Sequence, residues 1–111
     1  MEQTVKKGEN VIIISCAGRP DITAVDGFKK EIKTQLEAGE KNFIIDMNEA
    51  IYVDSSFLGA LVASLRSVSK AGGDIKIANL KPHLRSIFEL TRLHKLFNIY
   101  DSLEEAEASL K

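Results

Sequence analysis

The hydrophobic residues of this chain follow two alternating patterns. Residues 11–17 begin with an unbroken run of β-branched side chains, which is typical of a strand buried on both faces of a sheet. In residues 23–38, by contrast, Val25, Phe28, Ile32 and Leu36 recur at intervals of 3, 4 and 4, which predicts a helix with one apolar face. Gly39 follows as a stop signal for that helix.

The same two patterns continue along the rest of the chain. Residues 55–70 carry a second helical stripe, made of Leu58, Leu61, Val62, Leu65 and Val68. Gly72-Gly73 predicts the end of this helix, and Pro82 suits the first turn of the next one, which continues to residues 90–91. Ser102 with Glu105 forms a capping box for a last helix that ends at residue 110. Strands are expected at residues 5–7, 42–46, 74–78 and 96–100, with a short extended piece at residues 51–53.

The predicted order of elements is β-β-α-β-α-β-α-β-α. Strands that alternate with helices imply right-handed crossovers and a mostly parallel sheet flanked by helices. The opening hairpin adds an antiparallel strand at the edge. The 111 residues contain no linker and no internal repeat, so we expect a single α/β domain over residues 1–111 with a mixed, mostly parallel sheet.

Composition narrows the function classes. A formal net charge of -1 argues against strong non-specific binding to nucleic acid. The single cysteine, Cys16, lies in a predicted buried strand and has no partner for an internal disulfide, which fits a reducing, cytoplasmic setting. No apolar run is long enough to span a bilayer, and the first residues lack the apolar core of a signal peptide. We therefore expect a cytoplasmic protein without membrane insertion.

The chemistry of the sequence concentrates at Asp54-Ser55-Ser56, between a predicted sheet strand and a predicted helix. Asp and Ser are both preferred N-cap residues, so a purely structural role is one interpretation. The alternative is a ligand or modification site, because open α/β sheets bind ligands beyond the carboxyl ends of their strands. A phosphate placed here would meet the free N–H groups of the helix and the like charge of Asp54.

Other classes of site lack the residues they need. There is no Gly-x-Ser-x-Gly elbow, and His83 and His94 stand in a basic segment that favours surface positions. Two histidines and one buried cysteine do not make a metal site, and the strand at 11–17 lacks the acidic pair of an aspartate-phosphorylated receiver. Gly72-Gly73 follows a helix instead of opening one, so it is not a phosphate loop. We expect no enzyme activity, no metal and no cofactor.

Several segments together resemble a known family. Residues 46–61, which include Asp54-Ser55-Ser56, are similar to the signature of the STAS domain, as found in bacterial anti-sigma-factor antagonists. Gly18 with Asp21 resembles the family's turn before the first helix, and Gly72-Gly73 resembles its break before the fourth strand. Residues 90–97 are similar to its leucine-rich segment. The resemblance covers nearly the whole chain and implies the STAS fold.

The resemblance also implies a function. Such antagonists bind an anti-sigma factor that is also a serine kinase, and thereby free the sigma factor. The serine after the motif aspartate, here Ser55, is phosphorylated to break the complex, and a phosphatase resets it. The partner-binding residues that we expect are Asp21, Asp54, Ser55, Ser56 and Phe57. Two alternatives stay open: an unphosphorylated accessory subunit of a lipid or solute transport complex and, ranked last, a sensor with weak nucleotide binding.

One residue departs from the family pattern. Phe57 stands where the family usually has glycine. Its ring would either form part of a partner surface or fold over the serine and restrict a kinase. Because Phe57 lies about 100° from Leu58 around the helix axis, we expect it to be an exposed contact residue beside the partner surface. This feature also favours the transport-subunit alternative.

Overall fold

The computed structural model describes residues 2–19 and 22–110. Within them the chain order agrees with the predicted one, apart from one added 3-10 turn. The strands are β1 (Glu2–Gly8), β2 (Val11–Gly18), β3 (Asn42–Ala50), β4 (Asp74–Ala78) and β5 (Asn98–Tyr100). The helices are α1 (Ile22–Glu37), α2 (Ser55–Lys70), α3 (Pro82–Leu90) and α4 (Leu103–Ala108), with the 3-10 turn η1 (Leu93–Lys95) after α3.

The strands form one sheet in the order β1-β2-β3-β4-β5. β1 pairs with β2 antiparallel, through the hairpin that the sequence predicts. All other neighbours are parallel, for example with Ile14 opposite Ile45 and Ile45 opposite Ile77. The predicted mixed, mostly parallel sheet is therefore confirmed. Its parallel strands all end at the same edge, and the loop to α2 starts from that edge.

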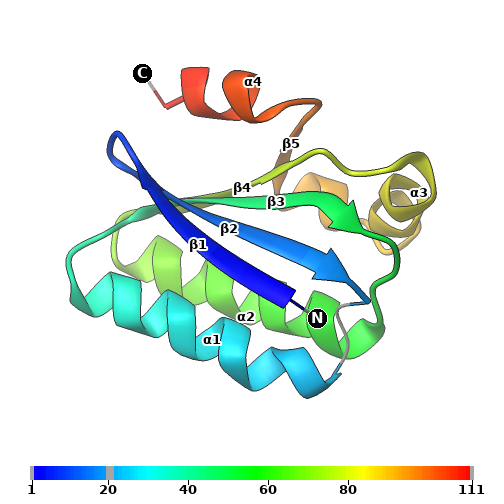
Figure 1. Ribbon diagram of the computed structural model, residues 1–111, viewed down its shortest axis with the longest axis horizontal. Coiled ribbons are helices and arrows are strands. Elements are labelled where there is room, and N and C mark those ends of the chain that lie inside the picture. The colour runs from blue at the N-terminus through cyan, green and yellow to red at the C-terminus, as the bar shows by residue number, and fades with distance from the viewer. Residues whose placement is uncertain (1, 20–21, 111) are drawn as a thin grey trace.

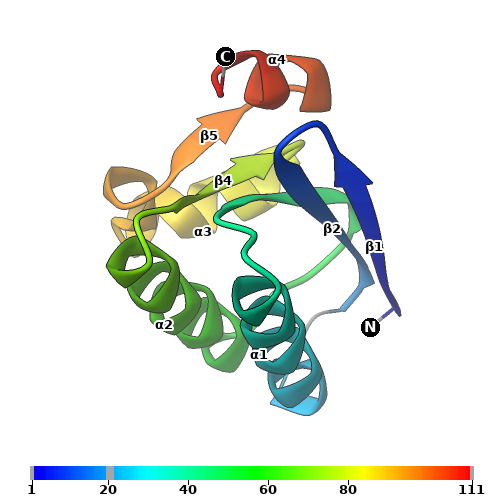
Figure 2. The same ribbon diagram turned by 90° about the vertical axis from the view of Figure 1, so that its left-hand side faces the viewer.

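The two faces of the sheet are covered unequally. α1 and α2 lie side by side on one face, and the short α4 lies on the other (Figures 1 and 2). Successive residues of β2 point to opposite faces of the sheet. Ile12 and Ile14 belong to the large core under α1 and α2. Val11 and Ile13 belong to a smaller cluster with Ala106 of α4. The expectation that residues 11–17 start as a strand buried on both faces is confirmed for Val11 to Ile14.

Element boundaries differ from the prediction in several places. β1 begins earlier, at Glu2, and α4 ends earlier, at Ala108. β3 runs on to Ala50, because a bulge opposite β2, between Ser15 and Ala17, lets pairing resume after Asp46. β5 is shorter than predicted: Arg92 adopts a left-handed conformation with φ 62° and starts the turn η1. The helix stop at Gly72-Gly73 is as predicted: Gly72 has φ +86°, and a Cβ at Gly73 would collide with the Lys41 carbonyl.

Within residues 2–19 and 22–110, no helix combines the length and the apolar character that a membrane span requires.

Candidate functional site

Ser55 is the first residue of α2, and Asp54 is the N-cap. Asp54 has extended backbone angles, φ -110° and ψ 175°, and its Oδ1 accepts a hydrogen bond of 2.9 Å from the Phe57 N–H. Val53, 3% exposed, anchors the preceding loop in the core. Ser55 itself is exposed. The helix start is thus capped by the aspartate, and the serine hydroxyl is left at the surface.

The loop before Ser55 is held from two sides. The Ile51 N–H donates to the Gly18 carbonyl at 2.7 Å, which ties the loop to the end of β2. From the start of α3, Lys81 Nζ donates to the Ala50 carbonyl at 3.4 Å. His83 Nε2 lies 2.9 Å from the Ile51 carbonyl and donates to it in the tautomer that carries its proton on Nε2. The fastened loop holds the start of α2, and with it the Ser55 hydroxyl, in a defined position.

An apolar hollow adjoins Ser55. It has a volume of about 260 Å³ and is lined by Ser55, Leu58, Gly59, Val62, Thr91 and Leu93. We call it the Ser55 hollow. Leu90, next to Thr91, is 85% exposed. Ser55 therefore borders an apolar depression formed between α2 and the segment after α3.

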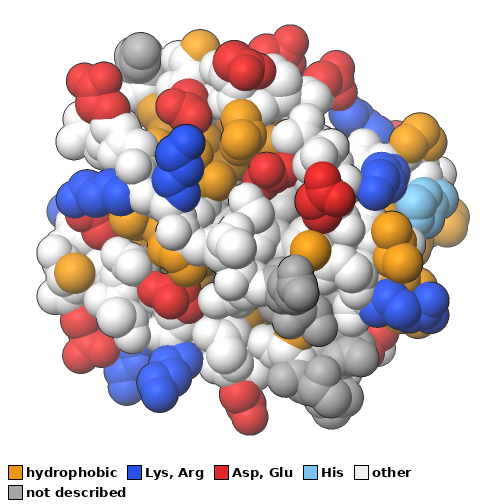
Figure 3. All heavy atoms as spheres, in the orientation of Figure 1, with side chains coloured by type: hydrophobic (Ala, Val, Ile, Leu, Met, Phe, Trp, Pro, Cys, Tyr) orange, Lys and Arg blue, Asp and Glu red, His pale blue; other side chains and the backbone are white. Residues whose placement is uncertain are grey.

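The loop also exposes apolar side chains on its outer side. Ile51 is 53% exposed and Tyr52 is 41% exposed. The guanidinium of Arg19 lies 4.6 Å from the centre of the Tyr52 ring, a cation–π contact that holds the ring at the surface. Hydrophobic, basic and histidine side chains gather over α3 and the chain after β3, at the right of Figure 3. Exposed aromatic and basic groups of this kind are frequent anchors of protein interfaces.

The prediction that Phe57 is an exposed contact residue is wrong. Its side chain is 0% exposed. The ring packs edge-on against Phe28 of α1, with ring centres 5.2 Å apart and an interplanar angle of 62°. Such aromatic pairs contribute about 0.5–1.5 kcal/mol beyond the area that they bury. Phe57 is thus a core residue that joins α2 to α1, and it contributes no surface to a partner.

The error has a physical cause in the position of α2. The sequence stripe through Leu58 and Val62 assumes one buried face, but α2 packs on both the sheet and α1. The buried arc is therefore wider and is rotated toward α1. Its residues are Phe57, Leu58, Ala60, Leu61, Ser64 and Val68. Leu65, at the centre of the predicted stripe, and Val62, at one edge of it, are only half-buried.

The other predicted site residues separate into three groups. Ser55 is exposed, and both Asp54 and Ser56 are half-buried beside it in the first turn of α2. Asp21 lies outside the described residues.

Within the described chain, no group of three or more His, Cys, Asp or Glu side chains is placed to hold a metal ion.

Cys16 is fully buried in β2. Burial, and secondarily the charge of Asp46, raises the pKa of its thiol to about 12. The thiolate is the reactive form of cysteine. Cys16 is therefore an inert core residue at neutral pH.

Sequence reasoning missed the residues that surround Ser55. Gly59, Thr91 and Leu93 line the Ser55 hollow, and Ile51 and Tyr52 form the exposed loop. Thr91 and Leu93 are distant from Ser55 in the sequence, and no local pattern shows that the end of α3 meets α2. Ile51 and Tyr52 are a weak sequence signal of an exposed apolar loop. They stand just before a helix cap, where they fit neither the alternation of a strand nor the period of a helix.

Comparisons with known proteins bear on this arrangement. The model of the STAS domain family matches residues 2–106. The anti-sigma-B factor antagonist of Bacillus subtilis is 30% identical over 95 residues, which cover 86% of each protein.

Solved structures agree with the fold. The crystal structure of protein TM1081 from Thermotoga maritima superposes with a TM-score of 0.90 at 25% identity, covering 96% of this chain and 92% of that one. The Bacillus anti-sigma factor antagonist SpoIIAA superposes in its unphosphorylated form with a TM-score of 0.78 at 20% identity, over 97% of this chain and 96% of that one. SpoIIAA has also been solved in a phosphorylated form.

Proposed function

We propose that this chain, which belongs to the STAS domain family, is an anti-sigma factor antagonist switched by phosphorylation of Ser55. In this proposal it is a cytoplasmic binding protein and not an enzyme. Its partner is an anti-sigma factor that is also a serine kinase, and a phosphatase restores the binding form. The observation that carries the proposal is the exposed Ser55 hydroxyl at the first position of α2, beside the Ser55 hollow.

The hollow supplies the reason why a phosphate would break a complex. A partner that covers Ser55 also covers Leu58, Val62 and Leu93, and it removes water from all of them. Phosphorylation adds a charge of about −1.5 to −2, which must then be buried against apolar side chains beside the Asp54 carboxylate. That carboxylate already accepts the Phe57 N–H. The added charge therefore meets desolvation and repulsion together in the complex.

The free protein tolerates the same charge. A phosphate at the first turn of α2 stays in water and faces the positive end of the helix, which stabilises it by about 0.3–1 kcal/mol. The residue that secures this turn to the core is Phe57, whose side chain is fully buried and separate from the exposed Ser55. The modification is therefore expected to act on binding and to leave the fold intact.

Exposed apolar residues near Ser55 supply affinity in this proposal. Leu90 is 85% exposed and Tyr52 is 41% exposed. Leu90 precedes Thr91 of the Ser55 hollow, and Tyr52 lies three residues before Ser55. A partner residue placed in the hollow would bury Leu58 and Leu93 around it, and a few such central contacts dominate most interfaces.

The alternative of an accessory subunit in a transport complex loses its sequence support. It was favoured by an exposed Phe57, and that side chain is buried. The alternative of weak nucleotide binding has no phosphate-binding loop in the sequence to support it. The kinase-linked antagonist is therefore the function that the site supports best.

The test is direct phosphorylation. The chain is incubated with ATP and the serine-kinase anti-sigma factor of its own host, and the modified residue is located by peptide mapping. We expect phosphate on Ser55, its loss in Ser55→Ala, and its retention in the matched control Ser56→Ala. Phosphate on Ser56 alone, or no phosphate on the wild-type chain, contradicts the proposal.

A further inference from the structure

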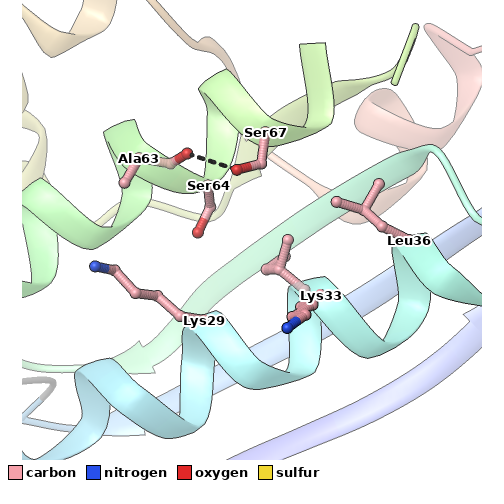
Figure 4. A pocket seen from close by; sticks show the side chains of 7 residues that line it. Lys29, Lys33, Leu36, Ala63, Ser64 and Ser67 are labelled. Atoms are coloured by element: carbon pink, nitrogen blue, oxygen red, sulfur yellow. Dashed lines mark hydrogen bonds between the residues drawn. The ribbon is translucent and has the colours of Figure 1, made fainter. Parts of the chain in front are cut away.

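A second hollow lies on the helical layer, away from Ser55. It runs between α1 and α2 and has a volume of about 300 Å³ (Figure 4). Its floor is apolar, formed by Ile32, Leu36 and Ala63. Lys29 and Lys33 stand on its α1 side, and Ser64 and Ser67 on its α2 side. We call it the α1–α2 groove. Its volume is at the lower end of the range for small-molecule sites.

Ser64 is the unusual residue of the groove. It is only 4% exposed, and its hydroxyl points into the space between the two helices (Figure 4). Serines inside helices often bond the carbonyl four residues earlier, as Ser67 does to Ala63 at 3.4 Å. Among the residues that the structure describes, Ser64 makes no such bond, and its hydroxyl is not one of the buried polar atoms left unpaired, so it is open to the groove. Water or a ligand in the groove can therefore supply its hydrogen bond.

The charges along the groove have one sign. Lys29 and Lys33 are one helical turn apart on α1, and no acidic residue lines the groove. The ion pairs found within residues 2–19 and 22–110 involve other basic residues, namely Lys7, Lys76 and Arg85. The groove therefore combines two ammonium groups, one hydroxyl that faces the groove and an apolar floor. This combination is complementary to an anionic head with a short apolar chain.

We propose that the α1–α2 groove is a binding site for a small amphiphilic carboxylate, of the class of medium-chain fatty acid anions. The carboxylate lies between Lys29 and Lys33 and accepts a hydrogen bond from the Ser64 hydroxyl. The hydrocarbon tail lies along Ile32, Leu36 and Ala63. The apolar floor selects an amphiphile over a bare anion. The lysines select an anion over a neutral chain, because attraction between opposite charges adds to hydrogen bonds that an alcohol oxygen could also accept.

This site is separate from the phosphorylation site. Ser64 follows Ser55 by nine residues, roughly 14 Å along the helix axis. The two sites also use different residues. Binding in the groove can therefore be tested without the kinase, and a negative result in one site leaves the other unaffected.

Octanoate, titrated into the ¹⁵N-labelled full chain below its micelle concentration, is the probe. We expect saturable amide shifts concentrated at residues 29–36 and 63–67. Octan-1-ol and inorganic phosphate should each bind at least about fivefold more weakly, since each lacks one of the two features that the groove recognises. Absence of shifts at these residues, or equal binding of octan-1-ol or phosphate, overturns the proposal.

Variants separate the groove from general charge effects. Lys29→Gln with Lys33→Gln should weaken octanoate binding by about fivefold, a modest factor because both ammonium groups are exposed to water. The matched control, Lys6→Gln with Lys30→Gln, changes the charge equally outside the groove and should bind as the wild type does. Ser64→Ala should also bind more weakly, with amide shifts in the free state confined to the neighbourhood of residue 64. Equal affinity of the two double variants contradicts the assignment.

Discussion

The first turn of α2 has two sides with opposite properties. Ser55 and Phe57 are two residues apart, about 200° around the helix axis. Ser55 is exposed beside an apolar hollow, whereas Phe57 is fully buried against Phe28. Asp54, next to Ser55, caps the helix by accepting a hydrogen bond from the Phe57 N–H, and it thus contacts both sides of the turn. This turn therefore exposes a hydroxyl on one residue and packs into the core through another. We expect that a charge added at Ser55 leaves the packing of Phe57 intact.

The largest loss of stability is expected when the buried side chain of this turn is removed. Phe57→Ala should lower the free energy of unfolding by about 3–5 kcal/mol, because it deletes a packed aromatic ring and leaves a cavity. Urea unfolding followed by circular dichroism measures it. Leu90→Ala is the matched control: Leu90 is 85% exposed, so its loss should change stability by less than about 0.5 kcal/mol. Similar losses in the two variants would show that Phe57 is not a core residue.

The next largest effect is expected on binding. Ser55→Asp introduces one negative charge at the exposed position, a partial imitation of a phosphate dianion. It should weaken binding to the anti-sigma factor at least tenfold, about 1.4 kcal/mol, with little change in the thermal midpoint. Calorimetric titration against the partner and a melting curve give the two quantities. An unchanged affinity would contradict the separate roles of Ser55 and Phe57. A weaker affinity accompanied by a clearly lower thermal midpoint would contradict them as well.

Asp54→Ala probes the residue between the two sides. It removes the side-chain acceptor for the Phe57 N–H and should lower the free energy of unfolding by about 1 kcal/mol, within the usual range for an N-cap. Asp54→Asn keeps an acceptor without the charge and should recover most of that loss. Chemical denaturation of both variants decides the matter. If Asp54→Ala is as stable as the wild type, the cap does not hold the turn.

The smallest effect is expected for Ser55→Ala. The sequence allowed Ser55 to share the capping role, but the cap is Asp54, and Ser55 is the first helical residue. Alanine there should change the free energy of unfolding by less than about 0.5 kcal/mol and should preserve binding to the anti-sigma factor. Denaturation and titration of the purified variant measure both. A loss of about 1 kcal/mol or more would mean that the Ser55 hydroxyl also supports the helix start.

The elements of the fold were largely predictable because their patterns are local. The bounds of α2 and β4 agree with the predicted ones, since Gly72-Gly73 and the alternation in residues 74–78 are strong signals. The end of β3 was not predictable. It depends on a bulge that lets β3 resume pairing with β2, and no feature within β3 itself encodes that pairing.

The exposure of Ser55 was predictable, and the residues that surround it were not. The exposure of Ser55 follows from its place after a strand and before a helix. The burial of Phe57 depends on where α1 lies, and the Ser55 hollow depends on where the chain after α3 returns to α2. Both are tertiary contacts between segments that are distant in the sequence. A stripe drawn on one helix cannot show how many neighbours that helix has.

The most direct measurement compares the affinity of the anti-sigma factor for the chain before and after phosphorylation of Ser55. The unmodified and fully phosphorylated chains are titrated under the same conditions, with thermal melts of both in the free state. We expect binding at least tenfold weaker after phosphorylation, a difference of about 1.4 kcal/mol or more, with nearly equal melting midpoints. Equal affinities would contradict the proposed switch.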